Sequence, residues 1–422
     1  MVDVLITNGP WLIAIAAAFG FLMAWGIGAN DVANAMGTSV GSNAITIKQA
    51  IIIAMIFEFA GAYLAGGEVT STIRKGIIDS AYFVDSPELL VYGMISALLA
   101  AGIWLVVASA LGWPVSTTHS IVGAIVGFAA VGVSADSVAW SKVLGIVGSW
   151  IITPAISGFI AFTIFQSVQK LIFNTDNPLE NAKRYVPFYM ALAGFVMSLV
   201  TIKKGLKHVG LHFTNVEAYS LAVFIAILVG IGGMIAIRRL KMSQSADRQT
   251  QFGNVEKVFA ILMIVTACCM AFAHGSNDVA NAIGPLAAVV SVVNSGGEIA
   301  SKAELVWWIL PLGAFGIVMG LAIFGKRVMQ TIGKNITHLT PSRGFAAELA
   351  AASTVVIASG TGLPISTTQT LVGAVLGVGM ARGIAAINIG VVRNIVVSWV
   401  VTLPAGAGLS IIFFFMIKGI FS

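Results

Sequence analysis

Long apolar runs separated by short polar breaks recur along the whole chain. Runs close to the roughly 20 residues needed to cross the hydrocarbon core of a bilayer lie near 11–27, 45–66, 89–111, 140–165, 186–202, 218–237, 258–273, 304–324, 345–360 and 390–417. Two shorter, glycine-rich runs lie near 120–133 and 370–386. Because a bilayer core satisfies no backbone groups, spans this apolar must be helices. The pattern predicts an all-α polytopic membrane protein with about 10–12 transmembrane helices, some of them broken or re-entrant.

The composition agrees with this pattern. Hydrophobic residues make up 58% of the chain and charged residues 9%, whereas a soluble domain has about a quarter of its residues charged. Most of the surface is therefore expected to face the lipid bilayer. We attribute the net charge of +6 to Lys and Arg that flank the membrane spans, and we expect no nucleic-acid partner.

Two polar motifs interrupt the apolar runs, and each occurs twice. GANDVANAMG at 28–37 returns as GSNDVANAIG at 275–284, with eight of the ten letters identical. PVSTTHSIVGAIVG at 114–127 returns as PISTTQTLVGAVLG at 364–377. The two pairs are offset by 247 and 250 residues, so the chain is an internal duplication with few insertions.

The duplication predicts three parts: a first transporter repeat at 10–170, linking spans with a cytoplasmic loop at 171–256, and a second transporter repeat at 257–420. The loop at 238–257 carries five basic and two acidic residues, and the positive-inside rule places it in the cytoplasm. Duplicated halves with polar breaks are typical of a secondary transporter. An odd number of crossings in each repeat would invert the second relative to the first, and we favour two inverted repeats.

The first motif places a carboxylate between amides at membrane depth, where a charged residue marks a candidate functional site. The side chains concerned are Asn30, Asp31, Asn34, Asn277, Asp278 and Asn281. Their oxygens suit a hard cation, and we expect Asn30, Asp31, Asn277 and Asp278 to bind sodium. The nearby glycines, among them Gly28 and Gly37, would permit an unwound stretch whose free carbonyls complete the ion's shell.

The second motif predicts a broken helix that restarts after the proline. Backbone N–H groups and the positive end of the helix dipole at such a restart bind oxyanions, and the hydroxyls add donors. We expect the substrate to contact the hydroxyl residues of both copies and the last asparagine of each first motif: Asn34, Ser116, Thr117, Thr118, Asn281, Ser366, Thr367 and Thr368.

The charge balance links the two motifs. None of the four segments contains Lys or Arg, yet the site would hold two carboxylates and an oxyanion. Several uncompensated negative charges in a low-dielectric cavity are prohibitively costly. The anion can therefore bind only if cations enter with it, which predicts cation-coupled symport.

Several ionisable residues break the duplication. Glu58 and Glu348 lie in apolar spans and have no acidic counterpart in the other repeat. We expect both to act as cation (sodium) ligands, or alternatively to pair with a buried base. His119 becomes Gln369 in the second copy, which argues against a shared metal-ligand role. For His274, which directly precedes the second Asn-Asp motif, we expect packing or hydrogen bonding.

The paired motifs resemble those of the inorganic phosphate transporter (PiT) family, over nearly the whole chain. The resemblance implies uptake of inorganic phosphate coupled to sodium or protons, inverted repeats and alternating access. It also places family positions associated with transport at Asp31, Asp278, Glu58, Glu348, Ser116 and Ser366. The chain departs from the family at Gln369, where a second His is common, and in its short loop at 238–257.

The sequence thus predicts a sodium–phosphate symporter, and not an enzyme, because no nucleophile-elbow or zinc signature is present. We expect a multi-pass protein of the cytoplasmic (inner) membrane, possible as a homodimer, that has no cofactor besides co-transported sodium. Three alternatives stay open: coupling to protons, transport of sulfate or another oxyanion, and a passive anion channel. A carboxylate that accepts the proton of phosphate would disfavour sulfate.

Overall fold

The computed structural model describes residues 2–203, 206, 211–242, 248–299, 305–332, 339–383 and 389–421. Within these residues the secondary structure is helical, apart from one isolated antiparallel bridge between Ile78 and Val138. The α-helices are α1 (Val2–Gly41), α2 (Ile47–Ala65), α3 (Gly67–Lys75), α4 (Pro87–Leu111), α5 (Thr117–Gly132), α6 (Trp140–Val168), α7 (Pro178–Lys203), α8 (Asn215–Arg238), α9 (Arg248–Asn294), α10 (Ile309–Ile332), α11 (Pro341–Gly360), α12 (Thr367–Arg382) and α13 (Ile389–Phe421). Two 3-10 helices (Ser80–Phe83 and Ala135–Ser137) and one π-helical turn (Gln169–Phe173) connect them.

Within the described residues, every apolar run predicted from the sequence overlaps a helix. Among the described residues, nine helices are long and apolar enough to cross a membrane. α5 and α12 have 16 residues each, which gives about 24 Å at 1.5 Å per residue and falls short of the roughly 30 Å hydrocarbon core. They are the short, re-entrant partners of α4 and α11, on which they pack.

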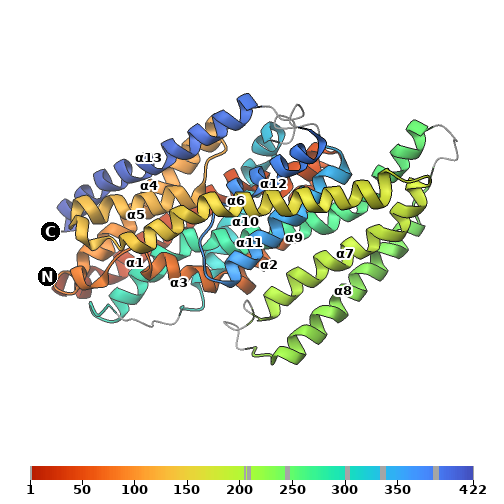
Figure 1. Cartoon of the computed structure of the whole chain (residues 1–422). Helices are drawn as coiled ribbons and strands as arrows, with labels where there is room; N and C mark the ends of the chain where they lie inside the picture. Colours follow the sequence, from red (N-terminus) through yellow and green to blue (C-terminus); the bar gives the residue numbers. More distant parts are fainter. Residues whose placement is uncertain are drawn as a thin grey trace.

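The two repeats are inverted. In Figure 1, α6 runs from left to right, whereas α13, its counterpart in the second repeat, runs from right to left. α1 starts at the left beside the N-terminus, and its counterpart α9 starts at the right. The repeats are also interleaved, because α10 packs on α1 and α2 on α9, while α12 packs on α6 and α13 on α5.

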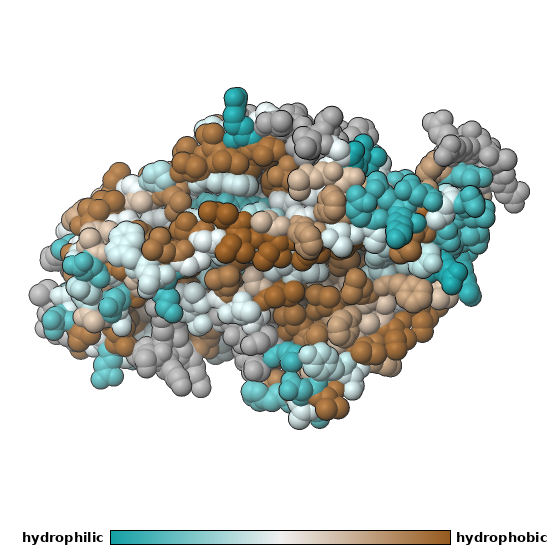
Figure 2. Space-filling view, viewed as in Figure 1, coloured by the Kyte–Doolittle hydropathy of each residue, from teal (hydrophilic) through white to brown (hydrophobic). Residues whose placement is uncertain are grey.

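The linking segment forms the hairpin of α7 and α8, which extends from the rest of the molecule at the lower right of Figure 1. α8 is exposed along much of its length: 22% of its apolar stretch is buried, compared with 67% for α9. Apolar residues cover the middle of the face in Figure 2, and polar residues gather toward its left and right ends. This distribution suits a protein surrounded by lipid.

The structure shortens the predicted cytoplasmic loop. We expected a loop over 238–257, but α8 ends at Arg238 and α9 already begins at Arg248, so about half of that segment is helical. Two to three turns into α9, its apolar stripe is already buried, with Val255, Val258 and Phe259 in the core. Burial of this stripe favours the helix over a loop.

Candidate functional site

The Asn-Asp motifs lie in the interior of α1 and α9, and both helices continue unbroken through them. The predicted unwound stretch is therefore wrong. The glycines serve close packing instead: a Cβ on Gly28 would lie 1.9 Å from the carbonyl oxygen of Ile317 in α10, and a Cβ on Gly275 would lie 2.2 Å from the carbonyl oxygen of Glu58 in α2. A glycine without side chain lets two helix backbones touch, and this contact holds the interleaved repeats together.

The Ser-Thr-Thr motifs form the N-termini of α5 and α12. The Ser116 hydroxyl oxygen caps α5 by accepting from the backbone N–H of His119, and Ser366 caps α12 in the same way through Gln369 (3.3 Å each). Pro114 and Pro364 lie before the caps in the non-helical connections, so each helix restarts after its proline. Both serines are buried.

The two N-termini meet at the centre of the molecule. The Thr118 hydroxyl donates to the carbonyl of Ile365 (2.8 Å), which precedes α12, and the Thr368 hydroxyl donates to the carbonyl of Val115 (3.4 Å), which precedes α5. α5 and α12, the two half-helices, thus each contact the segment that leads into the other. The positive ends of two helix dipoles consequently face one small region.

Contacts between the repeats join the two motifs. The amide of Asn34 in α1 donates to the hydroxyl of Thr368 at 2.7 Å. Its counterpart Asn281 in α9 donates to the hydroxyls of Thr118 at 3.2 Å and Thr117 at 3.4 Å. The structure therefore brings together, from both repeats, the side chains predicted to contact the substrate.

Asn30 and Asn277, predicted as sodium ligands, make other contacts in the structure. Asn30 donates to Ser109 and to the carbonyl of Trp113 (3.1 Å each) and accepts from the backbone N–H of Val115 at 3.3 Å. Asn277 contacts Ser359 at 3.0 Å and the segment between α11 and α12. Each asparagine fixes the connection into its own repeat's half-helix, because its amide bonds backbone groups that no helix satisfies.

The carboxylates of Asp31 and Asp278 both lie at the Nε2 side of His274, and Glu58 lies at its Nδ1 side. The imidazole Nε2 is 2.9 Å from Asp278 Oδ2 and 3.9 Å from Asp31 Oδ2, and its Nδ1 is 3.2 Å from Glu58 Oε1. All four side chains are at most 1% exposed. His274 is thus the central residue of a carboxylate–histidine cluster, and the packing or hydrogen-bonding role that we expected for it does not include this central position.

This cluster carries more potential negative charge than its one base can neutralise. Three carboxylates surround a single imidazole, which supplies at most one positive charge. The nearest ligand atoms of Asp31, His274 and Asp278 lie within 4.8 Å of one another, a spacing that fits a single small cation. Thr367 also donates to Asp278 Oδ2 at 2.7 Å, so the cation position and the hydroxyls of α12 share an oxygen.

Glu58 contacts a buried base, the second of the two roles that its sequence position left open. Neither Glu58 nor His274 has a counterpart of its kind in the other repeat, because Ile27 occupies the position equivalent to His274. The packing of α2 on α9 brings the two together. That both residues lack a counterpart in the other repeat was the one signal in the sequence for their contact, but no pattern pairs residue 58 with residue 274.

Glu348 lies in a separate cage of hydroxyls. Its Oε1 accepts from Thr38 and from Ser39 (2.5 Å), and its Oε2 accepts from Thr266 (2.7 Å). Thr38 and Ser39 follow Asp31 by about two helical turns, or roughly 11 Å along α1. The four acids of the predicted sodium set therefore occupy two places: Asp31, Glu58 and Asp278 lie around His274, and Glu348 lies in its own cage.

Comparisons with known proteins agree with this architecture. The family described as the phosphate transporter family matches residues 27–410. A putative phosphate permease of Haemophilus influenzae is 60% identical over 420 residues, covering 100% of both chains, and the chloroplastic inorganic phosphate transporter 2-1 of Arabidopsis thaliana is 43% identical, covering 96% of this chain and 72% of that protein. The solved structure of a protein described as the sodium-dependent phosphate transporter superposes with a TM-score of 0.90 at 42% identity, covering 97% of this chain and 99% of that one. The chain belongs to the phosphate transporter family, and it is a membrane transporter and not an enzyme.

Proposed function

We propose that this protein carries inorganic phosphate into the cell together with sodium ions, across the cytoplasmic membrane and by alternating access. The observation that carries the proposal is the pair of amide–hydroxyl contacts between the repeats, Asn34 with Thr368 and Asn281 with Thr117 and Thr118. These contacts gather donors at one place from motifs that lie up to 334 residues apart in the chain. A donor-rich region between two helix N-termini fits a tetrahedral oxyanion.

Phosphate would bind between the N-termini of α5 and α12. The hydroxyls of Thr117, Thr118, Thr367 and Thr368 and the amides of Asn34 and Asn281 would turn from one another to its oxygens. Ser116 and Ser366 keep a hydroxyl proton to donate, because each cap uses only the oxygen. Since no Lys or Arg occurs in the four motif segments, neutral donors and helix dipoles would supply the attraction.

Sodium would bind at the carboxylates. Asp31 and Asp278 offer oxygens on both sides of a small space, and hard cations prefer such ligands. Asn30 and Asn277 would hold the connections beside this space, and Glu58 would orient His274. The hydroxyl cage of Glu348, with oxygens from Thr38, Ser39 and Thr266, is a second candidate sodium position. The similar solved structure is that of a sodium-dependent phosphate transporter, which supports sodium as the coupling ion.

Alternating access would follow from the inverted repeats. Because the halves are inverted and interleaved around one site, exchanging the conformations of the two repeats would turn the site from one face of the membrane to the other. The oxyanion and its cations would neutralise each other inside, which lowers the cost of moving them through a low-dielectric interior.

Reconstituted protein tests the proposal. Radiolabelled phosphate uptake into proteoliposomes is measured with an inward sodium gradient, with a proton gradient and with neither. We expect concentrative uptake with the sodium gradient alone. Uptake that follows only the proton gradient would refute sodium coupling, and equal flux without any cation gradient would indicate a channel. Unlabelled sulfate in excess should not compete.

A further inference from the structure

A junction of four residues lies directly behind the substrate hydroxyls. It consists of two pairs of repeat counterparts: His119 of α5 with Gln369 of α12, and Trp150 of α6 with Trp399 of α13. The backbone N–H groups of His119 and Gln369 bond the cap serines Ser116 and Ser366. The junction is therefore built directly onto both half-helix N-termini.

His119 contacts three other helices from this position. Its ring stacks on that of Trp150 in α6, with centroids 3.7 Å apart and planes at 31°. Its Nδ1 is 3.4 Å from the carbonyl oxygen of Trp399 in α13, and the side chain of Gln369 in α12 lies close to its imidazole. The side chain is 2% exposed, so one residue of the first repeat is buried between α6 of its own repeat and α12 and α13 of the second.

The half-helices belong to two tightly packed pairs. α5 and α13 meet backbone to backbone, since a Cβ on Gly123 would lie 2.5 Å from the carbonyl oxygen of Leu403. α12 and α6 meet in the same way, since a Cβ on Gly373 would lie 2.2 Å from the carbonyl oxygen of Pro154. Each pair carries one set of substrate hydroxyls, so the spacing of the pairs sets the spacing of the hydroxyls.

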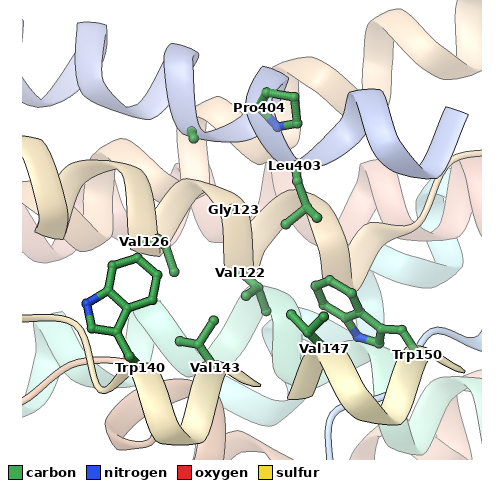
Figure 3. Close-up of a pocket in the computed structure, with 10 residues that line it drawn as sticks. Val122, Gly123, Val126, Trp140, Val143, Val147, Trp150, Leu403 and Pro404 are labelled. Atoms are coloured by element: carbon green, nitrogen blue, oxygen red, sulfur yellow. The ribbon is translucent and has the colours of Figure 1, made fainter. Parts of the chain in front are cut away.

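Between the first half of α6 and the pair of α5 and α13, the packing is loose. An apolar pocket of about 290 Å³ lies there, lined by Val122 and Val126 of α5, Trp140 and Trp150 of α6, and Leu403 of α13, among others (Figure 3). The pocket is open at the surface, because Trp140 is half exposed, so α6 packs loosely on α5 and α13 there. Trp150 forms the end of the pocket, and its stacking on His119 is the contact between α6 and α5 at that end.

We propose that His119 is a positioning residue that sets the distance between the α5 and α12 N-termini and thereby the size of the oxyanion that the site accepts. The proposal rests on the proposed binding of phosphate between these N-termini. Through its stacked ring, His119 ties the pair of α5 and α13 to α6, and thereby to α12, which packs on α6. Beside the open pocket α6 makes few other contacts with α5, so the two pairs can move apart when the ring is removed.

The functional test uses arsenate, a larger tetrahedral oxyanion of the same charge, as a competitor of labelled phosphate uptake. In His119→Ala we expect the phosphate KM to rise roughly tenfold, as for other small mismatches of fit. The inhibition constant of arsenate should change less. The preference for phosphate over arsenate should therefore narrow. Val122→Ala, which removes volume from the same pocket without touching Gln369, is the matched control and should keep the wild-type preference.

An unchanged phosphate KM, or equal weakening of phosphate and arsenate, would overturn the proposal. His119→Gln, which keeps an amide to meet Gln369 but loses the stacked ring, gives an intermediate preference if the junction sets the spacing. This variant also decides the matter if His119→Ala does not fold, as judged by size-exclusion chromatography of both proteins.

A distance measurement separates this proposal from the proposed function. Spin labels at the exposed positions Val131 of α5 and Met380 of α12, with Cys268 and Cys269 replaced by alanine, report the spacing of the half-helices without any transport. His119→Ala should shift or broaden the distance distribution. Superimposable distributions would refute the positioning role even if the protein transports phosphate, and failure of wild-type uptake would refute the phosphate function alone.

Discussion

Replacing Asp31 with asparagine removes a charge from the proposed cation position with little disturbance of the substrate donors. Neither carboxylate oxygen of Asp31 makes a hydrogen bond within the part of the chain that the structure describes. Asp278, in contrast, accepts from Thr367 and lies against His274. Asparagine has nearly the same shape and keeps one oxygen. Asp31→Asn therefore tests the contribution of the charge itself to sodium binding.

The magnitude follows from the spacing of the cluster. With ligand atoms within 4.8 Å of one another, a centred ion would lie about 2.4 Å from Asp31, close to usual distances between ions and oxygens. At an effective dielectric constant of about 20, the attraction is about 7 kcal/mol. Most of this attraction is offset, because the ion and the carboxylate must both be dehydrated and because asparagine still offers the ion one oxygen. We expect a net loss of about 2–3 kcal/mol, or roughly 30- to 150-fold in sodium affinity.

The assay is phosphate binding by calorimetry over a series of sodium concentrations. Because linkage between ligands is reciprocal, Asp31→Asn should weaken phosphate binding at low sodium and recover part of it at high sodium. Asp85→Asn, at an exposed loop position, controls for the chemical change. If Asp31→Asn matches the wild type at every sodium concentration, Asp31 is not a sodium ligand and the argument from charge balance fails.

Three further predictions follow from the same contacts. Ser116→Ala should raise the phosphate KM several-fold and cost about 1 kcal/mol of stability, because it removes a helix cap as well as a donor; an unchanged KM in uptake assays would leave Ser116 as a cap only. Glu348→Gln should lower the free energy of unfolding by about 1–3 kcal/mol, because hydroxyls lose acceptors. Glu58→Gln should instead chiefly change the sodium dependence of phosphate uptake, through His274. If the two variants have the same sodium dependence and the same melting temperature, this difference is contradicted. Gly28→Ala should destabilise by about 1–3 kcal/mol through overpacking against α10, while Gly148→Ala, with nothing within 4 Å of its added Cβ, should be neutral or stabilising in thermal unfolding.

The helices could be predicted because a bilayer fixes their length and composition. Each apolar run coincides with a helix, since a span of this kind has no other way to bond its backbone. The half-helices were visible as runs too short to cross, preceded by a proline and a cap serine. The ends of α9 were less predictable, because charged residues before Val255 suggested a loop although its buried stripe continues the helix.

The role of the glycines could not be predicted from the sequence. A glycine beside a buried aspartate suits an unwound, ion-binding backbone and a close helix crossing equally well. Only the position of α10, whose Ile317 carbonyl fills the space next to Gly28, decides between them. That position depends on the interleaving of the repeats, which no local pattern records.

The duplication predicted the symmetric part of the site, and the asymmetric part depended on packing. Residues that occur twice, such as Asn34 and Asn281, could be placed together because two copies of one motif around a shared axis must face each other. Glu58 and His274 each occur once, and their contact arises because α2 of the first repeat packs on α9 of the second. A strictly symmetric site would offer both faces of the membrane the same arrangement of charge. Because the glutamate–histidine pair occurs only once, the site is not symmetric. Under the alternating access proposed above, we therefore predict that the inward- and outward-facing states bind the cation with unequal affinity.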